Sequence, residues 1–456
     1  MSRTPAIKVG LISLGCPKNL VDSELMLGAL NREGMELVTD LRLADVLIIN
    51  TCGFIEAAKK ESIETILRTA ELRESGKASA LIVAGCLPQR YPKQLPQELP
   101  EVDAFIGLNE VPRIGAIVRD VLARKKDRTP QLFWSGPAKY VPDYAAPRFR
   151  LTPRHFAYVK IAEGCNHPCS FCSLPRIRGS HRSRPLEDVL AEVRALVSDG
   201  VREINLIAQD TTSYGKDLTG ERSLLSKLLR GMQRLDGDFW VRLLYTHPAH
   251  WSDELIETIT ACGKVCRYVD MPLQHINDEI LRRMRRETDS RQIRDLIGKI
   301  RHGIPGVALR TAFIVGFPGE TETQFAELLE FVAATRFDRL GVFIYSPEDN
   351  TVAGGMDGQL PARVKQQRRH RVMALQQRIS RELLRTQVGR TLRVLVDKRT
   401  PRGFIGRTVA DAPEIDGTVR VRGAARGGSP RMLRGEFADV RITGATEYDL
   451  IGVWEG

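Results

Sequence analysis

The chain has 456 residues, and a prior of roughly 100 to 200 residues per domain predicts two to four domains. Its formal net charge is +12, and no apolar run approaches the roughly 18 residues that span a membrane. The short polar start, Met1–Ala6, does not resemble a signal peptide. These features exclude a helical membrane protein and predict a cytoplasmic one, in which grouped cysteines bind metal or react more often than they form disulfides.

The first predicted domain, residues 1–124, alternates short apolar runs with helical stretches. That alternation predicts an α/β domain with a parallel sheet and right-handed connections. The predicted strands are Ile7–Leu14, Asp45–Asn50 and Ala80–Ala84, with helices at Ser23–Glu33 and Phe54–Ser75.

A cysteine follows each of these three predicted strands, at Cys16, Cys52 and Cys86. Ligands of open parallel sheets bind beyond the carboxyl ends of the strands, and neighbouring strands lie about 4.8 Å apart. Three thiols at three such ends can therefore reach one object. We interpret them as the ligands of a metal cluster; the alternative is three unrelated buried cysteines.

A linker is predicted at residues 125–154, where five prolines prevent a regular element. Residues 155–381 then show a second strand and helix series, which predicts a partial (β/α)6 barrel with its active site at the carboxyl ends of the strands. The six predicted strands are Phe156–Ile161, Glu203–Ala208, Trp240–Tyr245, Tyr268–Pro272, Leu309–Val315 and Leu340–Tyr345.

Three more cysteines, Cys165, Cys169 and Cys172, follow the first strand of this series. A structural zinc site has four protein ligands, and iron-sulfur clusters are usually held by four thiolates, so three thiolates leave one iron open. One alternative is a zinc site, for which His167 is an awkward fourth ligand because it lies inside the run. The other is three packed cysteines, which do not suit a loop containing Pro168.

The end of the chain is basic and then rich in short strands. Segment 361–385 contains eight Lys or Arg residues and one acidic residue, Glu382, so its net charge is +7. This charge indicates an acidic or nucleic-acid partner; the alternative is a solvated helix face. Residues 382–456 predict a small antiparallel β-barrel of a kind that binds oligonucleotides or peptides. Its predicted strands are Thr391–Asp397, Gly406–Ala410, Gly417–Arg422, Glu436–Thr443 and Leu450–Val453.

The segment from Lys160 to Cys165, the cysteine spacing and Phe171 resemble the radical S-adenosylmethionine (SAM) enzymes. The order of the domains, with Ser13–Glu24, Asn50–Ile55 and Ile207–Thr211, resembles the methylthiotransferases, in particular the RimO-type branch that modifies a ribosomal protein. The branch that acts on isopentenyl-adenosine in tRNA typically has Gln-Met-Asn after its first cysteine. This chain has Pro17-Lys18-Asn19 there.

The resemblance implies methylthiolation of the β-carbon of an aspartate in small-subunit ribosomal protein number twelve. It implies two [4Fe-4S] clusters with three Cys ligands each, SAM as cofactor and an electron donor. The catalytic SAM cluster would be held by Cys165, Cys169 and Cys172, and an auxiliary cluster by Cys16, Cys52 and Cys86. The other residues expected near SAM are Phe171, Gln209, Gln274, Arg310 and Gly316.

Two other functions stay open at this point. One is a methylthiotransferase acting on a modified adenosine in tRNA; the other is an RNA-binding or ribosome-associated factor whose clusters are structural. RNA contact would use helix 361–385 and the TRAM-like C-terminal barrel, which we expect to recognise the substrate. We expect a monomer and no membrane partner. Four further residues, Cys262, Cys266, His247 and His250, are expected to be structural, and the stretch Arg178–Pro185 has no assigned chemistry.

Overall fold

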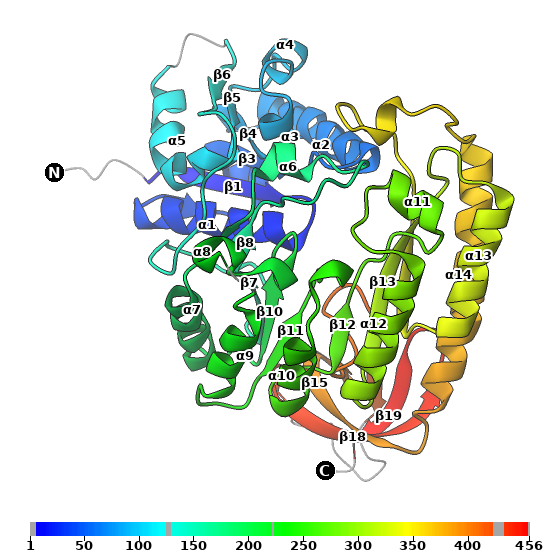
Figure 1. Cartoon of the computed structure of the whole chain (residues 1–456). Coiled ribbons are helices and arrows are strands. Elements are labelled where there is room, and N and C mark those ends of the chain that lie inside the picture. The colour runs from blue at the N-terminus through cyan, green and yellow to red at the C-terminus, as the bar shows by residue number, and fades with distance from the viewer. Residues whose placement is uncertain (1–5, 125–128, 221–222, 423–432, 455–456) are drawn as a thin grey trace. The chain divides into compact units, whose positions relative to one another are not determined.

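The computed structural model describes residues 6–124, 129–220, 223–422 and 433–454. The chain divides into two compact units (Figure 1). Unit 1 comprises residues 1–152, 160–167 and 172–184, and unit 2 comprises residues 153–159, 168–171 and 185–456. None of the helices in the described ranges is long and apolar enough to cross a membrane.

Unit 1 is built on a six-stranded sheet in the order β2-β1-β3-β4-β5-β6, with every pair parallel. Every residue of the neighbouring strands β3 and β4 is buried, as expected for a parallel sheet covered on both faces. The strands are β1 (Lys8–Ser13), β2 (Glu36–Leu37), β3 (Val46–Thr51), β4 (Ala80–Gly85), β5 (Ala104–Ile106) and β6 (Gln131–Phe133). The helices are α1 (Pro17–Arg32), α2 (Glu56–Ser75), α3 (Cys86–Arg90), α4 (Leu95–Glu98), α5 (Ile114–Ala123) and α6 (Leu174–Arg178); the paired strands β8 (Ala162–Glu163) and β9 (Arg182–Ser183) also belong to this unit.

The predicted parallel-sheet domain is confirmed, and so are its three long strands. Helix α1 begins earlier than predicted, because Pro17 occupies its first turn, where a missing N–H costs nothing. The prediction that the proline-rich segment contains no regular element was wrong, because Gln131–Phe133 forms strand β6, which pairs with β5. A strand at the sheet edge fits between Pro130 and Pro137 because it needs only one neighbour.

Unit 2 contains the predicted partial barrel, and each strand lies within two residues of its prediction. Sheets β11-β10-β7 and β12-β13-β14 are linked by a parallel bridge between Val241 and Val265. The strands are β7 (Phe156–Lys160), β10 (Glu203–Ile207), β11 (Trp240–Leu243), β12 (Tyr268–Asp270), β13 (Ala308–Val315) and β14 (Arg339–Ile344). The helices are α7 (Leu186–Ser198), α8 (Lys216–Thr219), α9 (Leu225–Gln233), α10 (Asp253–Ala261), α11 (Asp278–Arg283), α12 (Ser290–Gly303) and α13 (Glu322–Thr335).

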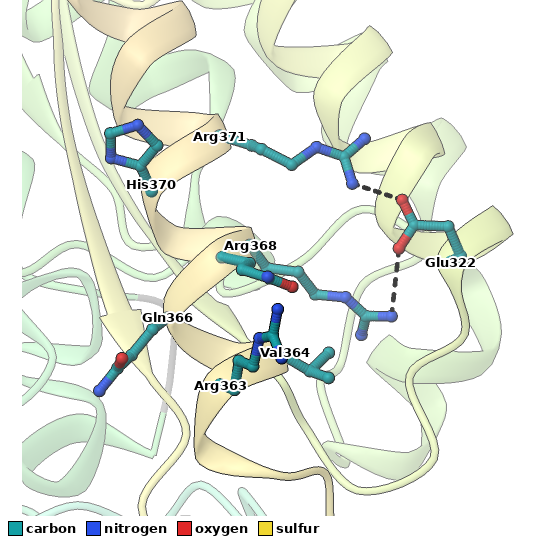
Figure 2. A pocket seen from close by; sticks show the side chains of 8 residues that line it. Glu322, Arg363, Val364, Gln366, Arg368, His370 and Arg371 are labelled. Carbon is teal, nitrogen blue, oxygen red and sulfur yellow. Dashed lines mark hydrogen bonds and ion pairs between the residues drawn. The ribbon is translucent and has the colours of Figure 1, made fainter.

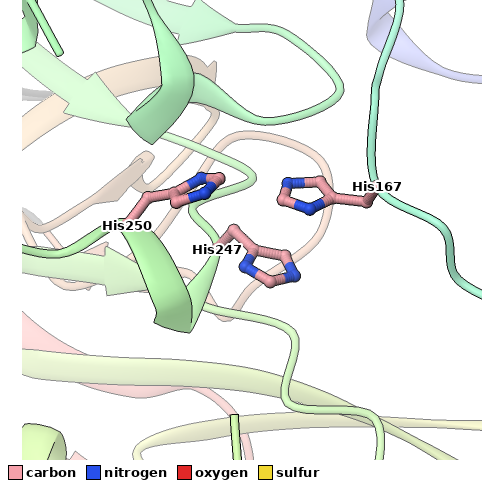
Figure 3. Close-up of side chains that lie close together, drawn as sticks. All are labelled: His167, His247 and His250. Atoms are coloured by element: carbon pink, nitrogen blue, oxygen red, sulfur yellow. The ribbon is translucent and has the colours of Figure 1, made fainter. Parts of the chain in front are cut away.

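Two histidines tie together the loops that follow β10 and β11 (Figure 3). The His250 Nδ1 atom lies 2.8 Å from Asp210 Oδ2, and the rings of His247 and His250 are 5.4 Å apart. Their structural role agrees with expectation. The third residue labelled there, His167, belongs to unit 1.

Helix α14 (Ala362–Arg385) is the predicted basic helix, and it packs against α13 and β14. Two of its basic side chains, Lys365 and Arg368, are buried. A pocket of about 430 Å³ lies beside its first turns, where Arg371 and Arg368 both pair with Glu322 (Figure 2). The other six basic residues of the helix are exposed, so the solvated helix face considered above stays open.

The C-terminal segment forms the expected closed five-stranded barrel, in the order β15-β16-β17-β19-β18. Its pairs are antiparallel except β17 with β19, which run parallel. The strands are β15 (Thr391–Thr400), β16 (Gly403–Arg407), β17 (Val419–Arg422), β18 (Phe437–Ala445) and β19 (Leu450–Trp454). The second strand is shifted from the predicted Gly406–Ala410, because residues 408–410 lie in a loop whose carbonyls accept hydrogen bonds from Arg242.

This loop, residues 408–416, lies against the amino-terminal halves of the partial-barrel strands. Arg242 of β11 donates to the Val409 carbonyl at 2.7 Å, and the Tyr268 hydroxyl donates to Asp416 at 2.7 Å. Next to the loop, Arg407 pairs with the buried Glu203 of β10 at 2.7 Å. The two barrels of unit 2 therefore share a polar, buried contact.

Candidate cysteine-based metal sites

The first group of cysteines gathers at the carboxyl ends of β1, β3 and β4. The strands are neighbours, and their register aligns Ser13 with Asn50 and Thr51 with Gly85. A Cβ built on Gly15 would lie 3.4 Å from Cys52 Sγ, so the chain entering Cys16 passes beside the Cys52 thiol. Burial raises the pKa of the Cys86 thiol to about 12, and the nearby Cys52 and Cys16 thiols act in the same direction. The fold thus brings the three thiols together.

Asn19, in the first turns of α1, holds these strand ends in place. Its side-chain nitrogen donates to the carbonyls of Leu14 at 2.6 Å, Asn50 at 3.4 Å and Thr51 at 3.3 Å. Its side-chain oxygen lies 4.0 Å from Cys86 Sγ. One buried amide therefore joins the chain after β1 to the end of β3 and contacts the third cysteine.

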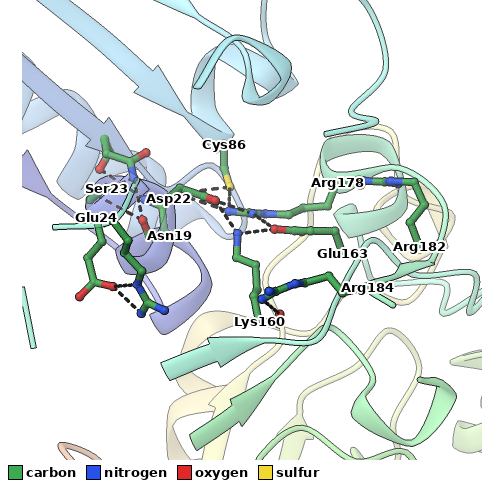
Figure 4. Close-up of polar contacts among 12 residues, drawn as sticks. Asn19, Asp22, Ser23, Glu24, Cys86, Lys160, Glu163, Arg178, Arg182 and Arg184 are labelled. Atoms are coloured by element: carbon green, nitrogen blue, oxygen red, sulfur yellow. Dashed lines mark hydrogen bonds and ion pairs between the residues drawn. The ribbon is translucent and has the colours of Figure 1, made fainter. Parts of the chain in front are cut away.

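Four buried charged residues lie beside Cys86 (Figure 4). Arg178 Nη1 lies 2.9 Å from Asp22 Oδ2 and 3.0 Å from Glu163 Oε1, while Lys160 Nζ binds both carboxylates. Two cations and two anions balance each other. The second guanidinium nitrogen of Arg178 lies 3.3 Å from Cys86 Sγ.

The second group of cysteines lies on a loop that passes between the two units, so each cysteine is described within its own unit. In unit 1, the buried Cys165 donates its backbone N–H to the Gly179 carbonyl at 3.1 Å. Gly164 precedes it with φ 78°, and a Cβ there would lie 1.9 Å from the Ser180 carbonyl oxygen. Only glycine fits at this position. The Cys172 sulfur accepts the Leu174 backbone N–H at 3.4 Å.

In unit 2, Cys169 lies beside an arginine from the segment after α11. Arg286 Nη1 approaches Cys169 Sγ at 3.5 Å, and Nη2 donates to the Pro272 carbonyl at 3.1 Å. The neighbouring Ser170 is anchored at both backbone and side chain, with its N–H bonded to Met284 O at 3.0 Å and its hydroxyl to Arg283 O at 2.7 Å.

N–H groups point at sulfur in both groups: Arg178 at Cys86, Arg286 at Cys169 and the Leu174 amide at Cys172. Such donors stabilise thiolates and tune the clusters that thiolates hold. Three cysteines per group and donors to their sulfurs fit iron-sulfur clusters. The sequence assigned no chemical role to Arg178 or Arg286, because they lie 92 residues from Cys86 and 117 residues from Cys169 and no local pattern joins them.

The other residues expected near SAM lie at several places in unit 2. Phe171 packs against the apolar cluster of Phe317, Tyr345 and Met284. Gln274 has φ 72° and its backbone pairs with β13 through the Ala312 carbonyl at 2.9 Å. Gln209 follows the end of β10. Their contacts with SAM stay predictions.

Two of these residues already have protein neighbours that account for their identity. Arg310, near the start of β13, donates to Asp270 at 2.6 Å and lies 3.5 Å from Asp416. Gly316 has φ 74°, and a Cβ there would lie 2.4 Å from Lys365 Cγ, so packing alone requires glycine. A role in SAM binding stays a prediction for both.

The remaining cysteines are buried, in agreement with the packing role expected for them. Burial raises the pKa of the Cys266 thiol to about 11, and Arg242 opposes that shift. Burial also raises the pKa of the Cys262 thiol. Both thiols therefore stay protonated at neutral pH and are poor nucleophiles.

Three family models match the chain. They are the uncharacterized protein family UPF0004 at residues 8–107, the radical SAM superfamily at residues 159–332 and the TRAM domain at residues 388–454. They follow the order of the three predicted domains.

Full-length relatives share about half of the sequence. The ribosomal protein uS12 methylthiotransferase RimO of Opitutus terrae is 54% identical and covers 99% of this chain and 97% of its own. The protein of the same name from Akkermansia muciniphila is 48% identical over 97% of this chain and 99% of its own.

Solved structures share the fold at low sequence identity. The radical SAM methyltransferase TsrM from Kitasatospora setae, solved with cobalamin and a [4Fe-4S] cluster, has a TM-score of 0.56 at 13% identity. It covers 90% of this chain and 79% of its own. The cobalamin-dependent radical SAM enzyme OxsB has a TM-score of 0.50 at 15% identity, covering 76% of this chain and 54% of its own.

Proposed function

Because the chain belongs to the RimO family of ribosomal protein uS12 methylthiotransferases, we propose that it methylthiolates the β-carbon of an aspartate in that ribosomal protein. The observation that carries this proposal is the pair of three-cysteine groups in a chain that matches RimO proteins from end to end. We place the reaction in the cytoplasm, where a ribosomal protein is available as substrate, and expect the enzyme to act as a monomer.

We assign a [4Fe-4S] cluster to each cysteine group. When bound, the cluster of Cys165, Cys169 and Cys172 supplies the electron that cleaves SAM to a 5′-deoxyadenosyl radical, and the cluster of Cys16, Cys52 and Cys86 holds the sulfur to be transferred. An unactivated C–H bond has no acidic proton, so the surrounding residues position groups and exclude water instead of acting as acids or bases. Asn19 fixes the strand ends that carry two of the auxiliary thiols.

The test is an anaerobic assay with reconstituted protein, SAM, a low-potential reductant and two substrates: a peptide of uS12 and a tRNA transcript carrying the modified adenosine. We expect one methylthio group on the peptide and none on the tRNA, measured by mass spectrometry. Modification of the tRNA alone would overturn the proposal in favour of the tRNA enzyme. Modification of neither, with intact clusters, would favour a structural role for them.

Two substitutions separate the roles of the cysteine groups. Cys169→Ala should abolish SAM cleavage, whereas Cys52→Ala should retain it and abolish methylthio transfer. The wild-type protein should hold about eight iron atoms per chain, and a Cys16→Ala, Cys52→Ala, Cys86→Ala variant about four. Transfer by the Cys52→Ala protein would contradict the assignment of the auxiliary cluster.

We further propose that α14 contacts RNA when the substrate is part of the ribosome. Arg369, Arg378 and Arg385 are exposed on this helix, whereas Arg371 is paired with Glu322 and Arg381 with Glu447. Phosphate contacts by such residues weaken as salt rises. Reversing the three exposed arginines to Glu should slow modification of ribosomal subunits and leave modification of the free peptide unchanged. Equal effects on both substrates would contradict the RNA contact. Arg371→Glu, on the same helix, is the control for each single charge reversal.

A further inference from the structure

Arg178 is a buried arginine at the end of α6, with 3% of its side chain exposed. Its guanidinium contacts the carboxylates of Asp22 and Glu163 through one nitrogen. The other nitrogen lies 3.4 Å from Asn19 Oδ1 and 3.3 Å from Cys86 Sγ. Figure 4 shows this side chain reaching from α6 to the cysteine. All of these residues belong to unit 1.

The surrounding charges hold this guanidinium in one place. Lys160 binds the same two carboxylates, so the buried group contains two cations and two anions. Breaking a buried ion pair by removing one partner is strongly destabilising, because it leaves an uncompensated charge. Arg178 therefore cannot swing away from Cys86 without leaving Asp22 and Glu163 less neutralised.

A fixed cation beside sulfur has a definite electrostatic effect on a cluster. The reduced cluster carries one more negative charge than the oxidised cluster, so a nearby positive charge stabilises the reduced form more. Hydrogen bonds to the sulfurs act in the same direction, and both raise the reduction potential. The effect is large at Cys86 because this thiol and Arg178 are buried, so the charge beside the sulfur is only weakly screened.

We propose that Arg178 is a positioning residue of the auxiliary site: it holds an N–H and a positive charge against the Cys86 sulfur and thereby raises the reduction potential of the cluster bound there. The inference rests on the proposed function only for the existence of that cluster. Arg178 follows Cys172 in segment 172–184 of unit 1, so a segment that carries one proposed ligand of the SAM cluster also sets the electrostatics of the auxiliary one.

The test isolates the auxiliary cluster in a full-length Cys165→Ala, Cys169→Ala, Cys172→Ala parent. This parent is titrated anaerobically at controlled potential and followed by electron paramagnetic resonance, with iron content measured alongside. Arg178→Gln in this background should titrate at a more negative potential. We expect about a tenfold lower ratio of reduced to oxidised cluster at a fixed potential, which corresponds to about 59 mV for a one-electron couple.

Two further variants and a control complete the design. Arg178→Lys keeps the positive charge, so its reduction potential should lie close to that of the parent. Arg178→Gln with Glu163→Gln keeps the buried charges balanced and serves if the single variant does not fold. It removes the N–H at Cys86 together with one charge of each sign, so its shift should have the same direction and be smaller. Arg176→Gln removes an equal charge from the exposed side of the same helix and should titrate like the parent.

The outcomes distinguish this inference from the proposed function. An unchanged potential in both Arg178→Gln proteins, with full iron content, would overturn the inference and leave the auxiliary cluster standing. A shift of equal size in Arg176→Gln would also overturn it, because the effect would then be one of total charge. A parent without bound iron would instead refute the auxiliary cluster itself, and with it the proposed function.

Discussion

At the scale of single residues, polar side chains beside the cysteines account for the backbone positions and the charge at the two cysteine groups. The Asn19 side chain donates hydrogen bonds to carbonyls at the ends of two strands. A buried carbonyl without a hydrogen-bond donor would cost free energy. Arg286 has a comparable place beside Cys169. The thiols are the ligands that we propose, and these neighbours hold the backbone beside them and set the charge around them.

Replacing Asn19 with Ala should lower the free energy of unfolding of the chain by about 1–3 kcal/mol, because buried acceptors lose their donor. The same change should reduce the iron retained by a protein that lacks the SAM-cluster cysteines. Urea denaturation followed by circular dichroism, with iron assays, measures both. Asn31→Ala is the matched control, since Asn31 is exposed on the same helix; its effect should stay within about 0.5 kcal/mol. Equal losses in the two variants would contradict the role of Asn19.

Replacing Arg286 with Gln should make the reduction potential of the SAM cluster more negative, for the electrostatic reason given for Arg178. The cluster can be measured alone in a Cys16→Ala, Cys52→Ala, Cys86→Ala background by the same redox titration. Arg282→Gln is a control on the preceding helix, because Arg282 is exposed and paired with Glu279. A potential equal to that of the background protein would show that Arg286 does not act on the cluster.

At the scale of elements, the join between β10, β11 and β16 depends on one buried acid. Burial opposes the ionisation of Glu203, but Arg407 and Arg242 outweigh it and lower the pKa of Glu203 below its usual 4.5. A group whose pKa is lower in the folded state stabilises the fold above its unfolded pKa. That contribution is lost as the pH falls below about 4.5, through the folded value.

We therefore expect the free energy of unfolding to fall more steeply below about pH 4.5 in the wild-type protein than in Glu203→Gln. At pH 7 the variant should be less stable by about 3 kcal/mol, because two buried arginines lose their anionic partner. Urea denaturation at a series of pH values measures both effects. Parallel pH curves for the two proteins would show that the pKa of Glu203 is the same in the folded and the unfolded chain. Asp397 also pairs with Arg407, so the free energy of unfolding should keep some dependence on pH in both the wild-type protein and Glu203→Gln.

At the scale of the whole molecule, the compact units do not follow the family segments. The radical SAM and TRAM segments share unit 2, whereas residues 160–167 and 172–184 of the radical SAM segment belong to unit 1. The two barrels of unit 2 meet through buried side chains such as Arg242 and Glu203. The C-terminal barrel is therefore an integral part of unit 2.

Removing residues 388–456 should destabilise the rest of unit 2, because Arg242 and Tyr268 lose the loop that accepts their hydrogen bonds. We expect a lower Tm and faster proteolysis of the truncated chain than of the full one. Arg393→Gln breaks exposed contacts with Asp238 and with the Phe437 ring, and should change stability by about 1 kcal/mol or less. A truncated chain with the Tm of the full one would show that the barrels fold independently.

Much of the fold could be predicted because it depends on local patterns. Apolar runs of strand length gave all three long strands of unit 1 and all six of the partial barrel. Three strands of the six-stranded sheet were missed, since β2 and β5 are too short to show a period and β6 lies among prolines. Strand β16 differs from its prediction for a tertiary reason, because carbonyls of the following loop accept hydrogen bonds from Arg242.

Local spacing was sufficient to indicate an open iron at Cys165, Cys169 and Cys172, because the ligands of that site are neighbours in the chain. The convergence of Cys16, Cys52 and Cys86 followed from strand order, which periodicity can predict. Only the tertiary structure placed Arg178 against Cys86 and loop 408–416 against β11. Electrostatic contacts of this kind depend on distances in space between residues far apart in sequence, and no local pattern encodes those distances.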